Sequence, residues 1–176
     1  ELNNDLGLEL RSEGNEFGAT TGRPRRCGSF DAVVLRYSAR VNACDSLVLT
    51  KLDVLDGLET IPICTAYQIG DKRRDEMPAE TWLLDQVTPV IEEMSGWQTP
   101  TSDIEDWADL PQACRDYVNR ISELASCEVG VLSVGAERRA IITVPGTRFG
   151  DWLANTCDSK RWRTSKVSTP FRPGES

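Results

Sequence analysis

The 176-residue sequence is long enough for one well-packed domain and short for two. Charged residues make up 27% of it and apolar residues 39%, a composition typical of a globular chain rather than a disordered one. The net charge of −8 argues against a general nucleic-acid binder, and no apolar run approaches membrane-spanning length, so neither a nucleic acid nor a membrane is an expected partner.

The first elements along the chain are two helices joined by a loop. Leucines spaced by four residues predict a helix over residues 1–14 that ends at Gly14. The glycine- and arginine-rich segment 18–28 predicts a loop, after which Ser29 is expected to cap the next helix. The apolar face of that second helix is expected to contain Phe30, Val34, Tyr37 and Val41.

The middle of the sequence predicts two strands and a helix. Residues 46–53 form a short apolar run that ends in charged residues, and residues 60–69 alternate in part and end at Gly70. The following segment is acidic and interrupted by prolines, and a helix is expected around residues 79–93.

The last third predicts a helix, two strands and a tail. Asp109 and Pro111 indicate the beginning of a helix that continues to about Ser126. Its apolar face is expected to contain Cys114, Tyr117, Val118, Ile121 and Leu124. Strands are expected over 128–135 and 139–144. The alternation predicts an α/β fold with a mixed, partly parallel sheet and flanking helices over residues 1–145, followed by a disordered basic tail over 146–176.

The motif "LTKLDVLDG" is suited to binding guanine. An ionised Asp53 at the end of a buried strand can accept hydrogen bonds from the ring N1–H and the exocyclic amine, while the stem of Lys51 covers the base. Adenine has no donor at N1, so it would leave the carboxylate unpaired. The alternative is that Asp53 caps a turn and Lys51 is solvated, and for the motif alone this alternative is favoured.

A second motif, "LSVGAER", comes after a later strand and is suited to the same base. Ser133 and Gly135 offer backbone N–H groups, and a glycine lets a planar ring approach closely. The alternative is a plain turn at the end of a strand. Together with Lys51 and Asp53, the motif favours a guanine site.

The loop "GATTGRPRRCG" can bind anions. Thr20 and Thr21, with the backbone of the neighbouring glycines, can form a concave anion site, and Arg23 and Arg25 can make bidentate contacts with carboxylates or phosphates. Pro24 stiffens the loop between these two arginines. The alternatives are a DNA minor-groove hook, which the acidic body and the single copy argue against, and a solvated basic turn.

Cysteine and histidine usage limits the possible chemistry. The 6 cysteines contain no CxxC pair and histidine is absent, so Ser-His and Cys-His catalytic pairs are excluded for this sequence. Reduced thiols in the cytosol are the expected state of the cysteines, and a cytoplasmic location is expected.

Taken together, these motifs resemble one family, the adenylosuccinate synthetases. The resemblance rests on "GATTGRPRRCG", "FDAVVLRY", "LTKLDVLDG", "AYQI", Gly96–Trp97 and "YVNRISEL…VGVLSVG", in the family's order and spacing over about residues 8–143. It implies the C-terminal segment of a P-loop-NTPase-like synthetase fold. It also implies a ligase reaction of AMP synthesis, in which GTP phosphorylates the 6-oxygen of IMP and the amine of L-aspartate displaces that phosphate to give adenylosuccinate.

The resemblance also implies residue roles. The aspartate loop would comprise Ala19, Thr20, Thr21, Gly22, Arg23, Pro24 and Arg25, with Arg23 also near IMP. The GTP contacts would be Arg25, Lys51, Leu52, Asp53, Ser133, Val134 and Gly135. Ala136 and Glu137 stand where the family has Pro-Asp, which changes the rigidity of this loop more than its contacts, and the residues after Val144 do not resemble the family.

The resemblance further implies a Mg²⁺ cofactor and a homodimer, although the residues themselves do not demand a dimer. The family's phosphate-binding glycine loop, metal ligands, catalytic Asp and catalytic His belong to an N-terminal portion that this sequence lacks. Neither catalytic nor metal-ligating residues are therefore expected in this chain, which is expected to be inactive alone. The alternative is a non-catalytic GTP- or IMP-binding regulatory module derived from the enzyme.

Overall fold

A computed structural model describes residues 1–137 and 139–156. Its α-helices are α1 (Asp5–Glu13), α2 (Ala32–Val41), α3 (Gln112–Ala125) and α4 (Arg148–Thr156). Its strands are β1 (Phe30–Asp31), β2 (Ser46–Leu49), β3 (Thr60–Ile69), β4 (Lys72–Arg74), β5 (Thr88–Ser95), β6 (Glu128–Ser133) and β7 (Ile141–Thr143). Short 3₁₀ helices are η1 (Leu52–Leu55), η2 (Thr81–Gln86) and η3 (Trp107–Asp109).

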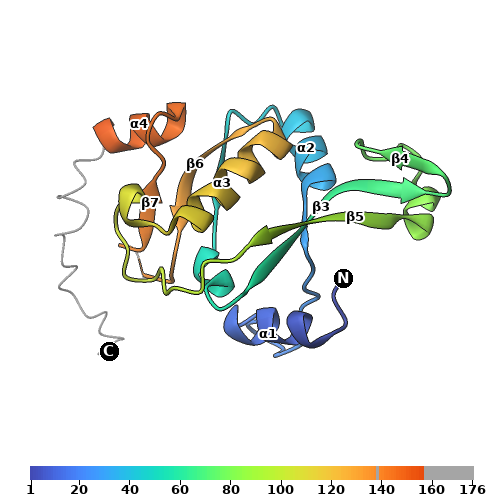
Figure 1. The fold of residues 1–176 in the computed structure, drawn as a ribbon, viewed down its shortest axis with the longest axis horizontal. Helices are drawn as coiled ribbons and strands as arrows, with labels where there is room; N and C mark the ends of the chain where they lie inside the picture. The colour runs from blue at the N-terminus through green and yellow to red at the C-terminus, as the bar shows by residue number, and fades with distance from the viewer. Residues whose placement is uncertain (138, 157–176) are drawn as a thin grey trace, which may run out of the picture.

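The strands form two sheets, each containing one parallel pair. In the first sheet the long strand β3 pairs with β5 along one edge. Along its other edge it pairs first with β1 and then with β4. Only the pairing with β1 is parallel. The β3–β5 pair extends from the body as an arm with β4 near its tip (Figure 1). In the second sheet β6 lies between β2, which is parallel to it, and β7, which is antiparallel. The expectation of a mixed, partly parallel α/β fold is confirmed.

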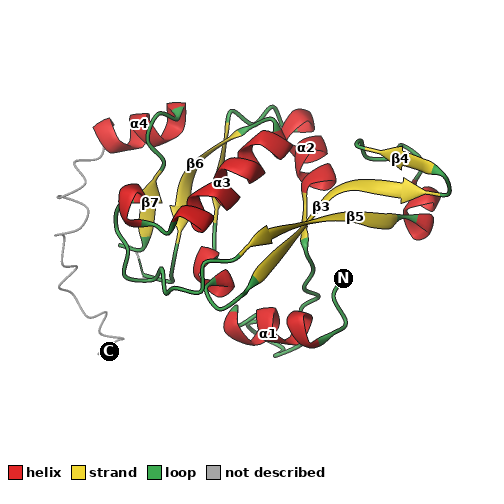
Figure 2. Cartoon of the chain, viewed as in Figure 1, coloured by secondary structure: helices red, strands yellow, loops and turns green. Residues whose placement is uncertain are grey.

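The core lies where α3 packs against β6 and against α2. Successive turns of α3 bury Cys114, Tyr117, Val118 and Ile121, as the spacing in the sequence predicts. Figure 2 shows α2 and α3 side by side between β6 and the β3–β5 pair, with α1 at the opposite end of the body. The helices thus hold the two sheets together at their shared centre.

The predicted helix over 79–93 is wrong. The structure has only the 3₁₀ helix η2 there, followed by β5, which pairs with β3 over nearly its whole length. Pro89 cannot occupy a helix interior, and side-chain burial alternates along β5, as expected for a strand with one covered face.

The predicted apolar face of the second helix is also wrong. The capping residue is Asp31 rather than Ser29: its Oδ1 accepts hydrogen bonds from the backbone N–H groups of Val33 and Val34, both at 3.0 Å. Its other oxygen accepts the hydroxyl of Tyr67 at 2.6 Å, which ties the helix start to β3. This anchor orients α2 so that Ala32, Val33 and Ala39 are buried. Val34, Tyr37 and Val41 are exposed.

The tail expected from residue 146 begins instead with α4. Glu128, at the start of β6, accepts hydrogen bonds from the N–H groups of Arg148 at 2.9 Å and Phe149 at 3.0 Å, and so satisfies two free donors of the helix start. Gly150 allows close packing, since a Cβ there would lie 2.3 Å from the carbonyl oxygen of Val144 and 2.8 Å from that of Gly130. The rest of the expected tail, 157–176, lies outside the described residues.

The carboxylate of Asp56 fastens η1 to the segment after β5. It accepts the indole N–H of Trp97 at 2.7 Å, the backbone N–H of Thr101 at 2.7 Å and the Thr101 hydroxyl at 2.8 Å. Trp97 and Thr101 are buried, so both depend on this one acceptor.

Replacing Asp56 with Ala should lower the free energy of unfolding by about 3 kcal/mol, because it leaves buried donors unpaired. Urea unfolding of the chain measures this. Asp85→Ala is the control, because Asp85 is exposed and its side chain bonds to no described residue; it should change stability little. Equal effects of the two substitutions would contradict the fastening role of Asp56.

Candidate functional site

The two motifs suited to guanine lie at one edge of the second sheet. β2 and β6 are parallel, and their last paired residues are Leu49 and Leu132. The segments after these residues, Lys51–Asp53 and Ser133–Gly135, therefore leave the sheet at the same carboxyl edge, and η1 contacts β6. This edge is where open α/β sheets bind their ligands.

Asp53 presents an unpartnered acceptor at this edge. Leu52 precedes it in η1 and is 1% exposed, which anchors the short helix in the core. The Oδ1 atom of Asp53 is buried and accepts no hydrogen bond from any described residue. A buried acceptor left unpaired costs about 1–3 kcal/mol, so a ligand that supplies a donor here gains that energy.

Lys51 is held in a strained backbone conformation. Its φ is 60°, in the left-handed region that non-glycine residues rarely adopt. Its ammonium donates a hydrogen bond to the carbonyl oxygen of Gly14 at 2.6 Å and forms an ion pair with Glu16. These contacts fix the charged end of Lys51 close to the opening loop.

Glu16 joins the opening loop to the end of β2. Besides Lys51, its carboxylate pairs with the guanidinium of Arg25 at 3.1 Å, and its carbonyl oxygen accepts the Arg25 N–H at 2.9 Å. The hydrogen bond from Lys51 is the main cause that lowers the pKa of Glu16, and the charges of Lys51 and Arg25 also lower it against the opposing effect of burial. Glu16 is not among the residues predicted from the sequence; the signal available was its place directly before the "FGATTG" motif.

The opening loop is closed by its own backbone and presents free side chains. Gly18 donates to the carbonyl oxygen of Arg23 at 2.8 Å, and Gly22, with φ of 64°, donates to that of Gly18 at 2.8 Å. The Thr21 hydroxyl accepts the backbone N–H of Arg23 at 3.3 Å. The side chains of Thr20 and Arg23 are exposed and have no partner among the described residues.

The remaining loop residues are the exposed Ala19 and Pro24, and Pro24 forms an isolated bridge with Phe17. Through Glu16, the structure connects Arg25 to Lys51. It shows no such connection for Arg23 among the described residues.

The Ser133–Gly135 turn keeps one donor free. The Ser133 hydroxyl donates to the carbonyl oxygen of Gly135 at 3.0 Å, and the N–H of Val134 donates to the carbonyl oxygen of Ala140 at 3.0 Å. The Val134 side chain is completely buried. The N–H of Gly135 has no acceptor among the described residues and remains available to a ligand.

A cavity of about 290 Å³ adjoins this turn. Gly135 and Ala136 form one part of its wall, and the segment 102–105 forms another. Residues 102–105 are not among those predicted from the sequence, because only the tertiary fold brings them to the "LSVGAER" turn.

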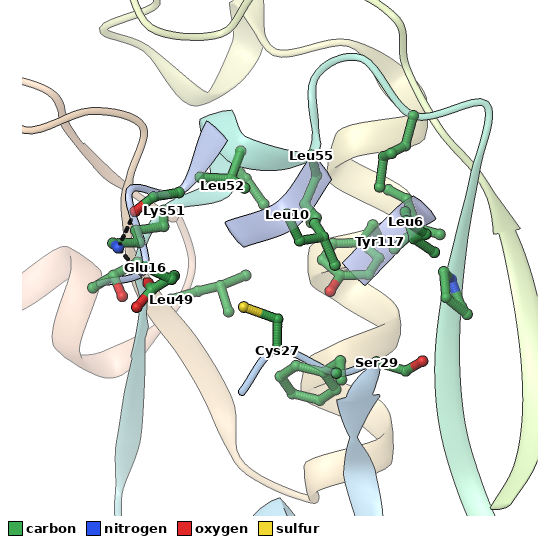
Figure 3. A pocket seen from close by; sticks show the side chains of 18 of the residues that line it. Leu6, Leu10, Glu16, Cys27, Ser29, Leu49, Lys51, Leu52, Leu55 and Tyr117 are labelled. Carbon is green, nitrogen blue, oxygen red and sulfur yellow. Dashed lines mark hydrogen bonds and ion pairs between the residues drawn. The ribbon is translucent and has the colours of Figure 1, made fainter. Parts of the chain in front are cut away.

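A larger cavity of about 430 Å³ lies between α1, the end of the opening loop and η1 (Figure 3). Six leucines line it together with Tyr117 and Cys27, and the Lys51–Glu16 pair lies at its edge. Of the predicted site residues only Lys51 and Leu52 line it. Because Asp53 and the Ser133–Gly135 turn do not, this apolar cavity is not the predicted guanine site.

The metal implied by the family resemblance finds no fitting site in the described residues. Residues 1–137 and 139–156 contain no group of three or more His, Cys, Asp or Glu side chains that could hold a metal ion. No residue of this part of the chain is therefore given a role at Mg²⁺. The described helices also include none that is long and apolar enough to cross a membrane.

Comparison with known proteins identifies similar chains. A family model described as adenylosuccinate synthetase matches residues 1–142. The adenylosuccinate synthetase of Bifidobacterium adolescentis is 49% identical over 144 residues, which are 82% of this chain and 34% of that protein. The adenylosuccinate synthetase of Geotalea daltonii is 50% identical over 138 residues, 78% of this chain and 32% of that protein.

A solved structure is similar as well. The structure of fully ligated adenylosuccinate synthetase from Plasmodium falciparum aligns with a TM-score of 0.78 and 36% identity. The alignment covers 82% of this chain and 35% of that one. This chain thus spans about a third of the length of the proteins it matches.

Glu16→Gln should destabilise the chain at neutral pH and have less effect in acid. A carboxylate whose folded pKa is lowered stabilises the fold above its unfolded pKa of about 4.3, and that stability is lost as the pH falls through the folded pKa. The difference in unfolding free energy between wild type and Glu16→Gln should therefore shrink as the pH falls below about 4.

Unfolding in urea at a series of pH values measures this. Glu13→Gln, at the exposed last residue of α1 with no side-chain partner among the described residues, should show no such dependence. A difference for Glu16→Gln that stays constant down to acid pH would contradict the ion pairing.

Proposed function

This chain belongs to the adenylosuccinate synthetase family, and we propose that it is the portion of such a ligase that holds the guanine of GTP and the carboxylates of L-aspartate. In the complete enzyme, GTP phosphorylates the 6-oxygen of IMP, and the amine of aspartate displaces the phosphate. The products are adenylosuccinate, GDP and phosphate.

The unpartnered Oδ1 of Asp53 carries the guanine assignment. The Asp53 carboxylate accepts the N1–H and the exocyclic amine of guanine, and the free N–H of Gly135 donates to the O6 oxygen. Lys51 covers one face of the base with its stem, because its ammonium is held aside by Gly14 and Glu16. Adenine is rejected, since it offers the carboxylate no proton at N1.

The free side chains of the opening loop support the aspartate assignment. The exposed guanidinium of Arg23 is available for a bidentate contact with a carboxylate of the amino acid, and Thr20 and Thr21 add hydroxyls. Arg23 also approaches the ribose of IMP. Arg25 lies on the GTP side, because Glu16 joins it to Lys51 of the guanine motif.

The chain alone should not complete the ligation. Phosphoryl transfer needs a phosphate cradle and a group that positions the nucleophile, and the sequence contains neither a GxxxxGK[ST] motif nor a histidine. Phosphate release with GTP, IMP, aspartate and Mg²⁺ should therefore be absent, with a full-length relative as positive control. Release that requires all three substrates would contradict this. GTP binding without phosphate release would also fit the alternative function, a non-catalytic GTP- or IMP-binding module.

Asp53→Asn should change the base preference of the site from guanine to xanthine. The amide nitrogen of Asn faces the guanine amine as a second donor, so GTP should bind about tenfold to a hundredfold more weakly. Xanthine has a carbonyl at that position, so the variant should bind xanthosine triphosphate more tightly than wild type does.

Titration calorimetry with both nucleotides measures the exchange. Asp71→Asn, in the exposed turn between β3 and β4, removes the same charge and should leave both affinities unchanged. If Asp53→Asn keeps wild-type GTP affinity and gains none for xanthosine triphosphate, the guanine assignment is wrong.

A further inference from the structure

Two cysteines far apart in the sequence meet at the amino ends of β2 and β6. Cys44 is exposed and lies shortly before β2, and Cys127 is half-buried and directly precedes β6. The Sγ of Cys127 lies 3.3 Å from the carbonyl oxygen of Cys44, a contact between residues 83 positions apart. Both thiols are free in this structure.

We propose that Cys44 and Cys127 form a reversible thiol–disulfide site, closed by a low-molecular-weight disulfide such as oxidised glutathione. The inference does not depend on the proposed function, because these cysteines lie at the end of the strands opposite to the candidate guanine site.

The fold keeps the two residues neighbours just before the strands begin. Strands β2 and β6 pair in parallel from Ser46 and Glu128 onward, and Cys44 and Cys127 lie shortly before these paired residues. The 3.3 Å contact between the Cys127 Sγ and the carbonyl oxygen of Cys44 shows that the two residues lie side by side there. Disulfides usually span about 4.4–6.8 Å between Cα atoms, so a bridge requires neighbouring residues of this kind.

The backbone around each cysteine is well anchored. Cys44 donates its N–H to the carbonyl oxygen of Ala39 at 2.9 Å, which closes the end of α2. The backbone N–H of Cys127 donates to the carbonyl oxygen of Ser122 at 3.3 Å, which closes the end of α3. The two cysteines are therefore held at the ends of two helices that contact each other.

The exposed Cys44 is the thiol that reacts first. Its thiolate attacks the glutathione disulfide, forms a mixed disulfide and releases one glutathione thiolate, which takes up a proton. The Cys127 thiolate then attacks the Cys44 sulfur and releases the second glutathione. Two thiols are oxidised and one glutathione disulfide is reduced to two glutathione thiols.

The second step is the slower one. Burial raises the pKa of Cys127, and the nearby Cys44, Glu128 and Asp45 raise it further, so little thiolate is present at neutral pH. Burial also raises the pKa of Cys64 to about 11 and that of Cys114 to about 12, which keeps these thiols out of the reaction.

The test treats the full chain with oxidised glutathione and measures intact mass and linked peptides. Wild type should lose two hydrogen atoms, carry no glutathione at these two residues, yield a peptide pair joining Cys44 to Cys127, and return to the starting mass with dithiothreitol. Cys127→Ser should stop at the mixed disulfide on Cys44. Cys44→Ser should form no bridge and should react slowly at Cys127.

Cys27→Ser is the matched control, because Cys27 is half-buried like Cys127 and lies in the opening loop; the bridge should form as in wild type. Circular dichroism of each variant verifies that it folds. The proposal is overturned if wild type accumulates glutathione on Cys44 without ever closing the bridge. Linkage of Cys44 to any cysteine other than Cys127 would overturn it as well.

Discussion

The parallel pairing of β2 with β6 is the constraint on which the candidate site depends. The two strands come from separate thirds of the chain, and the pairing of Leu49 with Leu132 places the two guanine motifs, which come after these strands, at one edge of the sheet. The buried side chains of Val129 and Leu132 hold β6 in the core. The candidate guanine motifs lie beyond one end of this strand pair, and the two cysteines lie before the other end.

Three carboxylates join elements that lie apart in the chain. Asp31 caps α2 and holds Tyr67, Asp56 joins η1 to Trp97 and Thr101, and Glu128 caps α4. Each satisfies donors that the local backbone leaves unpaired. Asp53 differs from them, because its buried Oδ1 has no partner among the described residues. That contrast is the physical basis for interpreting Asp53 as a ligand contact rather than as a structural fastener.

The opening loop is linked to the Lys51–Asp53 segment through one side chain. Glu16 accepts a hydrogen bond from Arg25 on one side and from Lys51 on the other, so movement of either loop displaces the shared carboxylate. Arg23 remains outside this link, with a side chain free of partners among residues 1–137 and 139–156. Of the two arginines assigned a role in the loop, Arg25 therefore positions the loop and Arg23 is available to a ligand.

The elements that can be predicted from the sequence are those whose burial is visible within one segment. Helix α3 buries residues that repeat on one face, and strands β3 and β6 are short apolar runs that are almost wholly buried. The candidate residues came from local motifs whose donors and acceptors match guanine and carboxylates, and from the resemblance of those motifs to one family. Three other features follow from the tertiary structure: the orientation of α2, set by Asp31 and Tyr67; α4, capped by Glu128; and the unpaired state of the buried Asp53 Oδ1. Each depends on which residues distant in the chain come together, and for Asp53 on the lack of a donor among the described residues. Local periodicity carries no information about which distant groups will meet.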